Sequence, residues 1–494
     1  MEKVLAAACA LALVALAALL GPTLGVASHA RSRGVENLPC RDESGPPRPG
    51  RPGPASGSGA NHLAVVGRRI FFAGCDRRHG WELWRSDGRR THARRVADIR
   101  EGRSGSAPDH LLDGGGTLYF TADDGVHGAE LWRSDGRRRG TRLVADVAPG
   151  PAGSRPHDLY WSPSLASLFF VADDGVHGDE LWVTDGTADG THLVADLEPG
   201  PGGSAPGEMI DRRGTLFFVA GTFFARQVYA LVGGRAVRVT SFEYDFHGPR
   251  SLVLLGDSLI LHAEDRTSGA GLWRIDDPAA GASRLDLGPG WPPAVRSLTA
   301  SAGVLHFVAP RPDLPDAWEL WRSDGTRAGT ARLSEISAGN FHAEAFREVA
   351  GKIYLYRRAS DESSEGLWIS DGTVGGIRRV KSVVLGTCGR LPPGELVPVG
   401  DRIFFVGHLG VRGELWVSDG TADGTHRVRD ILPGPDPSKP RETVAFGDRL
   451  AFTANDGRHG RELWVSDGTE KGTYMVRDVF RPGRRRPAGR AGLR

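Results

Sequence analysis

The chain alternates short apolar runs with separators rich in glycine and aspartate, and it shows no helical periodicity of useful length. Segment 110–155 is the clearest example, with apolar-rich runs near Leu111 and at 118–121, 130–133 and 143–147. The separators DGGG, DDGVHG and DGRRRGT suit tight turns, because glycine and aspartate accept positive φ. Each such segment is therefore predicted to form a four-stranded antiparallel meander.

The third run of this segment recurs along the chain as Glu-Leu-Trp followed shortly by Asp-Gly. Nine units place an aromatic residue in the same position, 44 to 50 residues apart: Trp84, Trp132, Trp182, Tyr229, Trp273, Trp321, Trp368, Trp416 and Trp464. The units around Tyr229 and Trp273 have lost most of the motif. A longer Pro/Gly-rich link follows the fourth run of several units, as in APGPAGSRP from Ala148. Such a link is long enough to reach the next sheet.

Four-stranded units of this length, joined by crossing links, are typical of a β-propeller. We therefore predict an all-β fold, with a single β-propeller of four-stranded antiparallel blades over residues 61–480. Closure into a ring covers the sheet faces that an open stack would expose. Nine blades are favoured because the spacing holds through the eroded units. An eight-bladed ring, with one eroded unit as an insert, is the alternative.

The flanks differ in composition from the repeats. Residues 1–30 contain an unbroken apolar run followed by small residues and are predicted to be a signal peptide. A retained membrane anchor is the competing interpretation. Residues 31–60 form a Pro/Gly-rich tether and residues 481–494 a basic tail, both predicted to be disordered. The protein is therefore expected to be secreted, extracellular or associated with the cell envelope.

The repeated residues are first explained by the fold. Alternation along a strand puts Glu and Trp of Glu-Leu-Trp on one face, so the tryptophans are predicted to fill the space between blades. The glutamates are expected to be half buried and to need partners such as backbone amides or an indole N–H. The aspartates of Asp-Gly-Thr are predicted to form turns. A calcium site is a weaker alternative, because a second acid follows in only two units, at Asp189 and Asp423.

The motif resembles the ELWxxDGT repeat family of bacterial secreted and surface proteins. Glu, Leu, Trp, Asp, Gly and Thr are all present in the copies that begin at Asp179, Trp318, Gly413 and Arg461, and the resemblance extends over 61–480. Units one and two have Arg89 and Arg137 in place of the first threonine. The resemblance implies a propeller-like β fold and an extracellular location, with no assigned reaction.

Charge and motifs narrow the function. Lysine and arginine number 62 against 60 acidic residues, and this net charge of +2 gives no field that would attract nucleic acid, so no nucleic-acid partner is expected. Beyond the signal, no stretch reaches 18 apolar residues, so no integral membrane domain is expected. The sequence has no Gly-x-Ser-x-Gly elbow, no His-Glu-x-x-His and no phosphate loop ending in Gly-Lys-Ser/Thr.

The leading interpretation is a non-catalytic extracellular binding or scaffold protein, expected to be a monomer. It would hold a polysaccharide or a surface protein on the propeller face. The alternative is a polysaccharide-degrading enzyme with loop carboxylates in the central funnel. No cofactor is indicated, and a divalent cation is left open.

The turn between the second and third strands is the candidate binding site. It reads Asp-Asp-Gly-Val-His-Gly in units two and three and has related forms in units nine and one, which are consecutive in a closed ring. The simpler explanation is that each histidine caps its own hairpin. The functional one is that this arc binds a divalent cation, an anion or a sugar. The candidates are Asp76, His79, Asp123, Asp124, His127, Asp173, Asp174, His177, Asp456 and His459.

The cysteines indicate one disulfide. Removal of Cys9 with the signal leaves Cys40, Cys75 and Cys388, an odd number for an oxidising compartment. Cys40 lies on the tether and could reach either of the other two. We prefer a Cys40–Cys75 bond because it closes the shorter loop.

Overall fold

The computed structural model describes residues 60–479, except 223, 245–247, 289–293, 311–317, 334–341, 359–364, 386–395, 410–411 and 435. The described residues belong to one compact unit, Pro39–Arg494. The predicted signal peptide, the basic tail and all of the tether except Ala60 lie outside the described residues.

The described chain forms nine antiparallel sheets, one for each repeat, and so confirms the propeller and its nine blades. The strands of blades 1 to 3 are β1 (Ala60–Val66), β2 (Arg69–Asp76), β3 (Gly80–Ser86), β4 (Ala93–Arg95); β5 (Asp109–Gly114), β6 (Thr117–Asp123), β7 (Ala129–Ser134), β8 (Arg142–Leu143); β9 (His157–Ser162), β10 (Ser167–Asp173), β11 (Asp179–Thr184) and β12 (His192–Ala195). A single 3₁₀ turn, η1 (Arg138–Gly140), is the helical part of the described chain.

The two eroded units build complete blades, so neither is an insert in an eight-bladed ring. The strands of blades 4 to 6 are β13 (Gly207–Arg212), β14 (Thr215–Ala220), β15 (Gln227–Val232), β16 (Arg235–Arg238); β17 (Arg250–Leu255), β18 (Ser258–Ala263), β19 (Gly271–Ile275), β20 (Ser283–Arg284); β21 (Arg296–Ser301), β22 (Val304–Pro310), β23 (Trp318–Ser323) and β24 (Ala331–Arg332).

The inner strand of blade 8 is split in two, β29 and β30, and both parts pair with β31. The strands of blades 7 to 9 are β25 (His342–Val349), β26 (Lys352–Arg358), β27 (Gly366–Ser370), β28 (Ile377–Lys381); β29 (Val384–Leu385), β30 (Val397–Val399), β31 (Arg402–Leu409), β32 (Arg412–Ser418), β33 (His426–Arg427); β34 (Arg441–Phe446), β35 (Arg449–Asn455), β36 (Arg461–Ser466) and β37 (Tyr474–Arg477).

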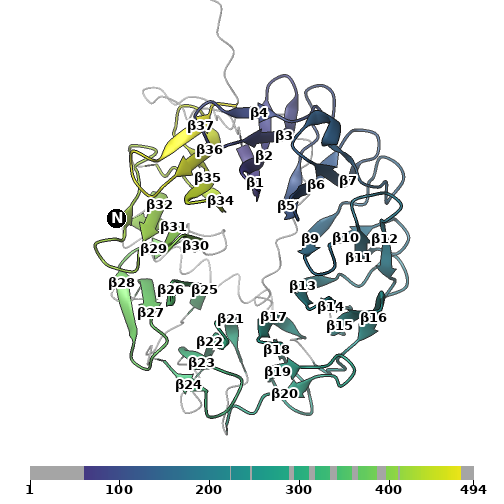
Figure 1. Ribbon diagram of the computed structural model, residues 1–494, viewed down its shortest axis with the longest axis vertical. Helices are drawn as coiled ribbons and strands as arrows, with labels where there is room; N and C mark the ends of the chain where they lie inside the picture. The colour runs from purple at the N-terminus through teal and green to yellow at the C-terminus, as the bar shows by residue number, and fades with distance from the viewer. Residues whose placement is uncertain are drawn as a thin grey trace, which may run out of the picture. The chain divides into compact units, whose positions relative to one another are not determined.

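The blades stand around an axis, with the first strand of each innermost (Figure 1). Blade 1 lies beside blade 9, and within the described residues the two remain separate sheets. Side chains from both form one core cluster, in which Trp84 and Phe72 pack with Leu463 and Val465. The Thr91 amide also donates to the Val476 carbonyl at 2.7 Å. Among residues 60–479 as described, the ring is therefore closed by packing and loop contacts and not by a shared strand.

The repeated aromatic residue packs against the preceding blade, as predicted. Trp84 belongs to the cluster between blades 9 and 1, Trp132 to that between blades 1 and 2, and Trp464 to that between blades 8 and 9. Tyr229 takes the same place between blades 3 and 4, where it stacks on Phe218 with ring centroids 5.7 Å apart. The aromatic position is thus kept by the need to fill the space between neighbouring sheets.

The glutamate of the motif is fully buried, which corrects the expectation of half burial. Glu130 is 0% exposed, and its carboxylate accepts the Ala148 and Ser154 amides at 3.1 and 2.8 Å and the Ser154 hydroxyl at 2.5 Å. Ser154 ends the crossing link, so the carboxylate ties that link to its own blade. Glu82, Glu180 and Glu414 hold Ser106, Ser204 and Ser438 in the same way. Burial raises the pKa of Glu82 to about 7.

Blade 4 makes the same attachment with an amide. Gln227 stands in the glutamate position, and its Oε1 accepts the Thr240 hydroxyl and the Phe242 amide at 2.8 and 2.9 Å. Its Nε2 donates to the Phe242 carbonyl at 2.9 Å. The link of blade 4 therefore offers one acceptor, whereas the links held by glutamate offer donors alone to the side chain.

This difference predicts that the two side chains cannot be exchanged. Glu130→Gln places an N–H₂ against link donors, and Gln227→Glu places a carboxylate against the Phe242 carbonyl. Each variant should lower the free energy of unfolding by about 1–3 kcal/mol, because a buried polar atom loses its partner. Chemical denaturation measures the loss, and the exposed Glu101→Gln is the control. Wild-type stability in both exchange variants would show that these hydrogen bonds between the buried side chain and the crossing link do not stabilise the fold.

Candidate functional site

The innermost strands share a backbone irregularity near their start. A register shift interrupts the pairing of the first two strands in eight blades, for example between Asn61 and Leu63 and between Asp109 and Leu112. In seven blades a residue other than glycine at this bulge has φ between 48° and 58°. Such values are uncommon for side chains with a Cβ and cost roughly 1–3 kcal/mol each, so the surrounding structure must impose them.

We name these seven residues the axial belt. They come from the innermost strands around the ring axis (Figure 1) and are His62, His110, Asp158, Glu208, Ser251, Ser297 and Glu442. The backbone geometry repeats around the ring, so it belongs to the fold. The side chain is polar each time, and the seven positions share four residue types: histidine, aspartate, glutamate and serine. Variation of polar groups on a constant backbone is what a binding surface requires.

The belt and its neighbours bring polar groups of blades 9, 1 and 2 into contact, and Asp158 of blade 3 acts on His110 through its charge. His62 Nδ1 lies 2.9 Å from Asp109 Oδ1, which joins blade 1 to blade 2. His110 Nδ1 lies 3.9 Å from the same oxygen. The Glu442 carboxylate of blade 9 accepts the backbone N–H of His62. We call Glu442, His62, Asp109, His110 and Asp158 the belt arc.

His62, Asp109, His110 and Glu442 of the arc have shifted pKa values. Burial lowers the pKa of His62, but the hydrogen bond and charge of Asp109 outweigh it and leave this pKa raised. For Asp109, burial acts upward, yet the His62 hydrogen bond and charge bring its pKa below the ordinary value. Burial lowers the pKa of His110 and raises that of Glu442. The arc therefore gathers imidazoles and carboxylates whose pKa values are shifted in different directions.

The belt continues into blades 4 and 5 with similar contacts. The Glu208 carboxylate accepts the Leu252 amide at 3.2 Å, across the boundary between the two blades. Glu208 is exposed to solvent, but the surrounding protein desolvates it enough to raise its pKa. Carboxylates of the belt thus reach the backbone of the next blade and help to position it.

The predicted turn residues adopt the hairpin-capping arrangement. His79, His127, His177 and His459 each place Nδ1 2.7 to 2.8 Å from the aspartate of their own turn, at Asp76, Asp124, Asp174 and Asp456. The same aspartates accept the backbone N–H of these histidines. These contacts explain the turns structurally. Ligand binding by them stays a prediction.

The remaining predicted aspartates also serve the backbone. Asp123 and Asp173 accept the amides of Gly125 and Gly175 at 2.6 and 2.8 Å. Asp123 additionally pairs with Arg100 of the crossing link at 2.6 Å. In the described part of the chain, no group of three or more His, Cys, Asp or Glu residues is placed to hold a metal ion.

The turns and the belt lie on the same face of the ring. An inner strand starts where the second strand ends, so the start of β1 and the turn between β2 and β3 are at the same end of blade 1. Gly128 and Gly178 of these turns have φ near 70°, and a Cβ on either would meet the backbone of the following link within 2.6 Å. The glycines therefore let turn and link pack together on this face.

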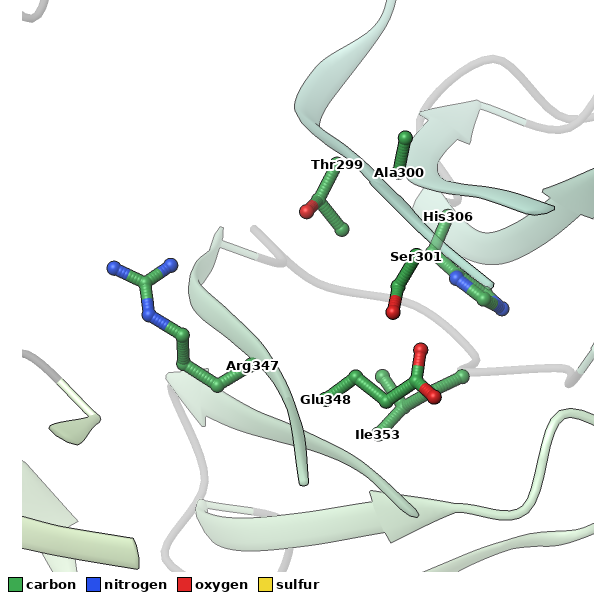
Figure 2. Close-up of a pocket in the computed structure, with 7 residues that line it drawn as sticks. All are labelled: Thr299, Ala300, Ser301, His306, Arg347, Glu348 and Ile353. Carbon is green, nitrogen blue, oxygen red and sulfur yellow. The ribbon is translucent and has the colours of Figure 1, made fainter. Parts of the chain in front are cut away.

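A small cavity lies at the opposite end of the blades, between blades 6 and 7. Its volume is about 200 Å³, and its lining includes Ser301, His306 and Glu348. Figure 2 shows Ser301 and Glu348 turned toward each other, while Arg347 points away. Burial lowers the pKa of His306. The cavity is smaller than most ligand sites, which measure roughly 300–1,000 Å³, and it is distant from the belt in the strand direction.

Sequence reasoning missed the belt because no residue type marks it. The available signal was a polar residue directly before the first large apolar residue of each unit, as in His62-Leu63, His110-Leu111, Asp158-Leu159 and Glu208-Met209. Positive φ normally suggests glycine or asparagine, and none of the seven belt residues is either.

Cys75 is disulfide-bonded and 0% exposed. The predicted partner, Cys40, lies outside the described residues, as does Cys388. No helix in the described ranges has the length and apolar character needed to cross a membrane.

The chain has distant likenesses among solved structures. No family model matches the chain, and no curated protein matches it. The computationally designed Ika8 protein is 15% identical with a TM-score of 0.39, and the match covers 66% of this chain and 86% of that one. The β-propeller domain of the Trilobed protease from Pyrococcus furiosus is 11% identical with a TM-score of 0.34, covering 65% and 94%. A prolyl endopeptidase structure is 10% identical with a TM-score of 0.42, covering 65% of this chain and 49% of that one, about half its length. These likenesses concern the fold alone.

The His62–Asp109 pair predicts a defined pH dependence. A raised histidine pKa stabilises the fold below the ordinary value of 6.5, and this contribution fades as pH rises through the folded pKa. A lowered aspartate pKa stabilises above 3.8, and its contribution fades as pH falls. Asp109→Asn should therefore cost about 1 kcal/mol between these two values and less at alkaline pH.

Denaturation across pH and NMR titration of His62 measure both effects. In Asp109→Asn the pKa of His62 should fall. Asp448→Asn removes an aspartate that is 92% exposed and serves as the control. An unchanged His62 pKa in Asp109→Asn would show that the pair is not coupled.

Proposed function

We propose that this protein is a non-catalytic extracellular binding protein that holds a polysaccharide on the face of the ring that carries the belt arc. The observation that carries the proposal is the constant strained backbone that presents histidine, aspartate, glutamate or serine in each of seven blades. Carboxylates accept hydrogen bonds, and imidazole and hydroxyl groups both donate and accept them, so together they suit sugar hydroxyls. The polar belt favours a glycan over a protein partner, which usually buries aromatic and aliphatic residues at its centre.

His110 gives the arc a group that is ready for a ligand. Its Nδ1 is buried and has no hydrogen-bond partner among the described residues. A buried polar atom without a partner costs free energy. A ligand can recover this free energy if the imidazole of His110 turns to make a hydrogen bond with it. We place the centre of the binding site at His110 and Asp158, between blades 2 and 3.

We also propose that the protein is secreted and belongs to the ELWxxDGT repeat family. The resemblance to the ELWxxDGT repeats and the signal-like residues 1–30 support secretion. The disulfide at Cys75 supports the same conclusion, because disulfides persist in oxidising compartments.

Retention of polysaccharides tests the proposal. The purified protein is immobilised and exposed to a panel of neutral cell-wall and extracellular polysaccharides. His110→Gln/Asp158→Asn should weaken retention of the bound polymer by about tenfold or more, because two hydrogen-bonding groups are altered. His192→Gln/Asp189→Asn makes the same chemical changes at exposed positions outside the belt, on blade 3, and should leave retention unchanged. Equal retention by both variants would place the glycan elsewhere, and no retention by the wild type would refute the proposal.

The second candidate is a polysaccharide-degrading enzyme, favoured by one observation. Glu442 and Asp109 stand on either side of His62, and their pKa values are shifted in opposite directions. A raised carboxyl and a lowered one are what a general acid and its partner require in glycoside hydrolysis.

Release of shorter chains distinguishes the two candidates. The binding proposal predicts no new reducing ends from any polysaccharide of the panel at any pH. If chains shorten and Glu442→Gln abolishes the shortening while retention persists, the protein is an enzyme and the non-catalytic proposal is wrong. Glu101→Gln again provides a matched control on the surface.

A further inference from the structure

A second site lies at the end of blade 1 opposite to the belt. A cleft of about 520 Å³ is lined by Arg69, Arg85, Ser86, Asp87, Thr91, His92, Ala93 and Arg94 of blade 1 and Arg477 of blade 9. Its size is within the roughly 300–1,000 Å³ of ligand sites. Four of its nine lining residues are arginines, although the whole chain carries a net charge of only +2.

Three of these arginines share one face of the sheet. Arg85 of β3 pairs directly with Arg94 of β4, and Arg85 also pairs with Phe71 of β2. Arg69 is two residues before Phe71 and so points to the same side. Like charges in directly opposed positions destabilise a sheet. In the described part of the chain, none of the three forms an ion pair that would offset this cost.

Blade 2 helps to position two of the guanidinium groups. Arg69 Nη1 donates to the Asp135 carbonyl at 3.0 Å. A Cβ on Gly136 would lie 3.2 Å from Nη1 of both Arg69 and Arg85, so the two guanidiniums gather over this glycine. Gly136 has φ of 80°, which also disfavours other residues here. The cationic groups are thus brought together before any ligand arrives.

The turns beside the cleft extend the positive charge. Blade 1 has Arg89 and Arg90 after Asp-Gly, and blade 2 has three exposed arginines, Arg137 to Arg139, in the same position. Blades 3 and 8 have Thr-Ala-Asp there, and blade 9 has Thr-Glu-Lys. Blade 6 has one arginine there, Arg327, so it is the runs of two and three arginines that are particular to blades 1 and 2.

We propose that this cleft binds anionic polysaccharide through the carboxylate or sulfate groups of its sugars. The planar guanidinium pairs with such groups by two parallel hydrogen bonds. The cleft also holds Asp87, whose carboxylate lies 3.2 Å from His92 Nδ1, beside Thr91. An aspartate repels a bare anion but accepts sugar hydroxyls, so the lining suits a ligand that carries both kinds of group. The inference rests on the proposed glycan-binding role but on different residues.

The lining argues against single-stranded nucleic acid, the other common polyanion. None of the nine lining residues is phenylalanine, tyrosine or tryptophan, whereas single-stranded nucleic acid is held largely by bases stacked on such side chains. The belt arc does not compete for acidic sugars, because it carries Glu442, Asp109 and Asp158. The two sites therefore sort sugars by charge.

The affinity of the protein for three carbohydrate probes tests whether the cleft binds acidic sugars. The probes are oligogalacturonate, its neutral methyl ester and dextran sulfate, measured by calorimetry with the full chain at low and high salt. The wild type should bind oligogalacturonate or dextran sulfate but not the ester, and salt should weaken the binding. Arg85→Gln/Arg94→Gln should reduce it by about tenfold or more, because two charge-assisted contacts are lost. Arg235→Gln/Arg327→Gln removes the same charge from exposed positions on blades 4 and 6 and should have little effect.

The outcomes separate the cleft from the belt. Binding of oligogalacturonate would indicate a site for carboxylate groups, and binding of dextran sulfate a site for sulfate groups. Three results would overturn the proposal for the cleft. They are an equal loss of acidic-glycan binding in both double arginine variants, equal binding of the methyl ester, and tighter binding of single-stranded DNA. Loss in His110→Gln/Asp158→Asn instead assigns the acidic glycan to the belt, which overturns the cleft and leaves the binding role standing. If neutral polysaccharides are retained but no acidic oligomer binds, the cleft inference alone fails.

Discussion

A buried carboxylate holds the blade and its crossing link together, and the ring depends on this contact. Glu130 is surrounded by three link donors, and the same contact recurs wherever Glu-Leu-Trp is followed by a link that ends in serine. The link sets where the next inner strand begins, so the carboxylate fixes the spacing between blades as well as the shape of one. Gln227 shows that the interaction is defined by donors and acceptors and not by charge.

The sequence was sufficient to predict the sheet but not the belt. Trp132 and Asp185 sit in a repeated motif, and a repeated residue in a repeated fold has one structural task, which the pattern reveals. Even Tyr229 could be aligned with the tryptophans by spacing alone. The burial of the glutamates was underestimated, because the link that covers them has no regular pattern. The belt was missed because its positive φ is imposed by packing between inner strands, and no local residue preference announces it.

The near-zero net charge of the chain conceals two clusters of opposite character. The belt arc gathers Glu442, Asp109 and Asp158 near the axis, whereas the cleft of blade 1 gathers Arg69, Arg85 and Arg94 at the other end of the strands. The overall composition averages these local charges over the whole chain, so the net charge of +2 does not reveal them. The repeat allows these clusters to be separate, because each blade can change its exposed residues while the repeated aromatic residue and the buried Glu or Gln remain.

Each blade is made from one uninterrupted repeat, and within the described residues the first and last blades exchange no strand. The position of the termini on the circumference is therefore arbitrary from the standpoint of backbone pairing. A circularly permuted chain, opened at a different link, would leave no strand without its neighbour. Duplication or deletion of a whole repeat in the course of evolution would likewise change the circumference without disturbing any sheet, which makes an unusually large ring accessible by small genetic steps.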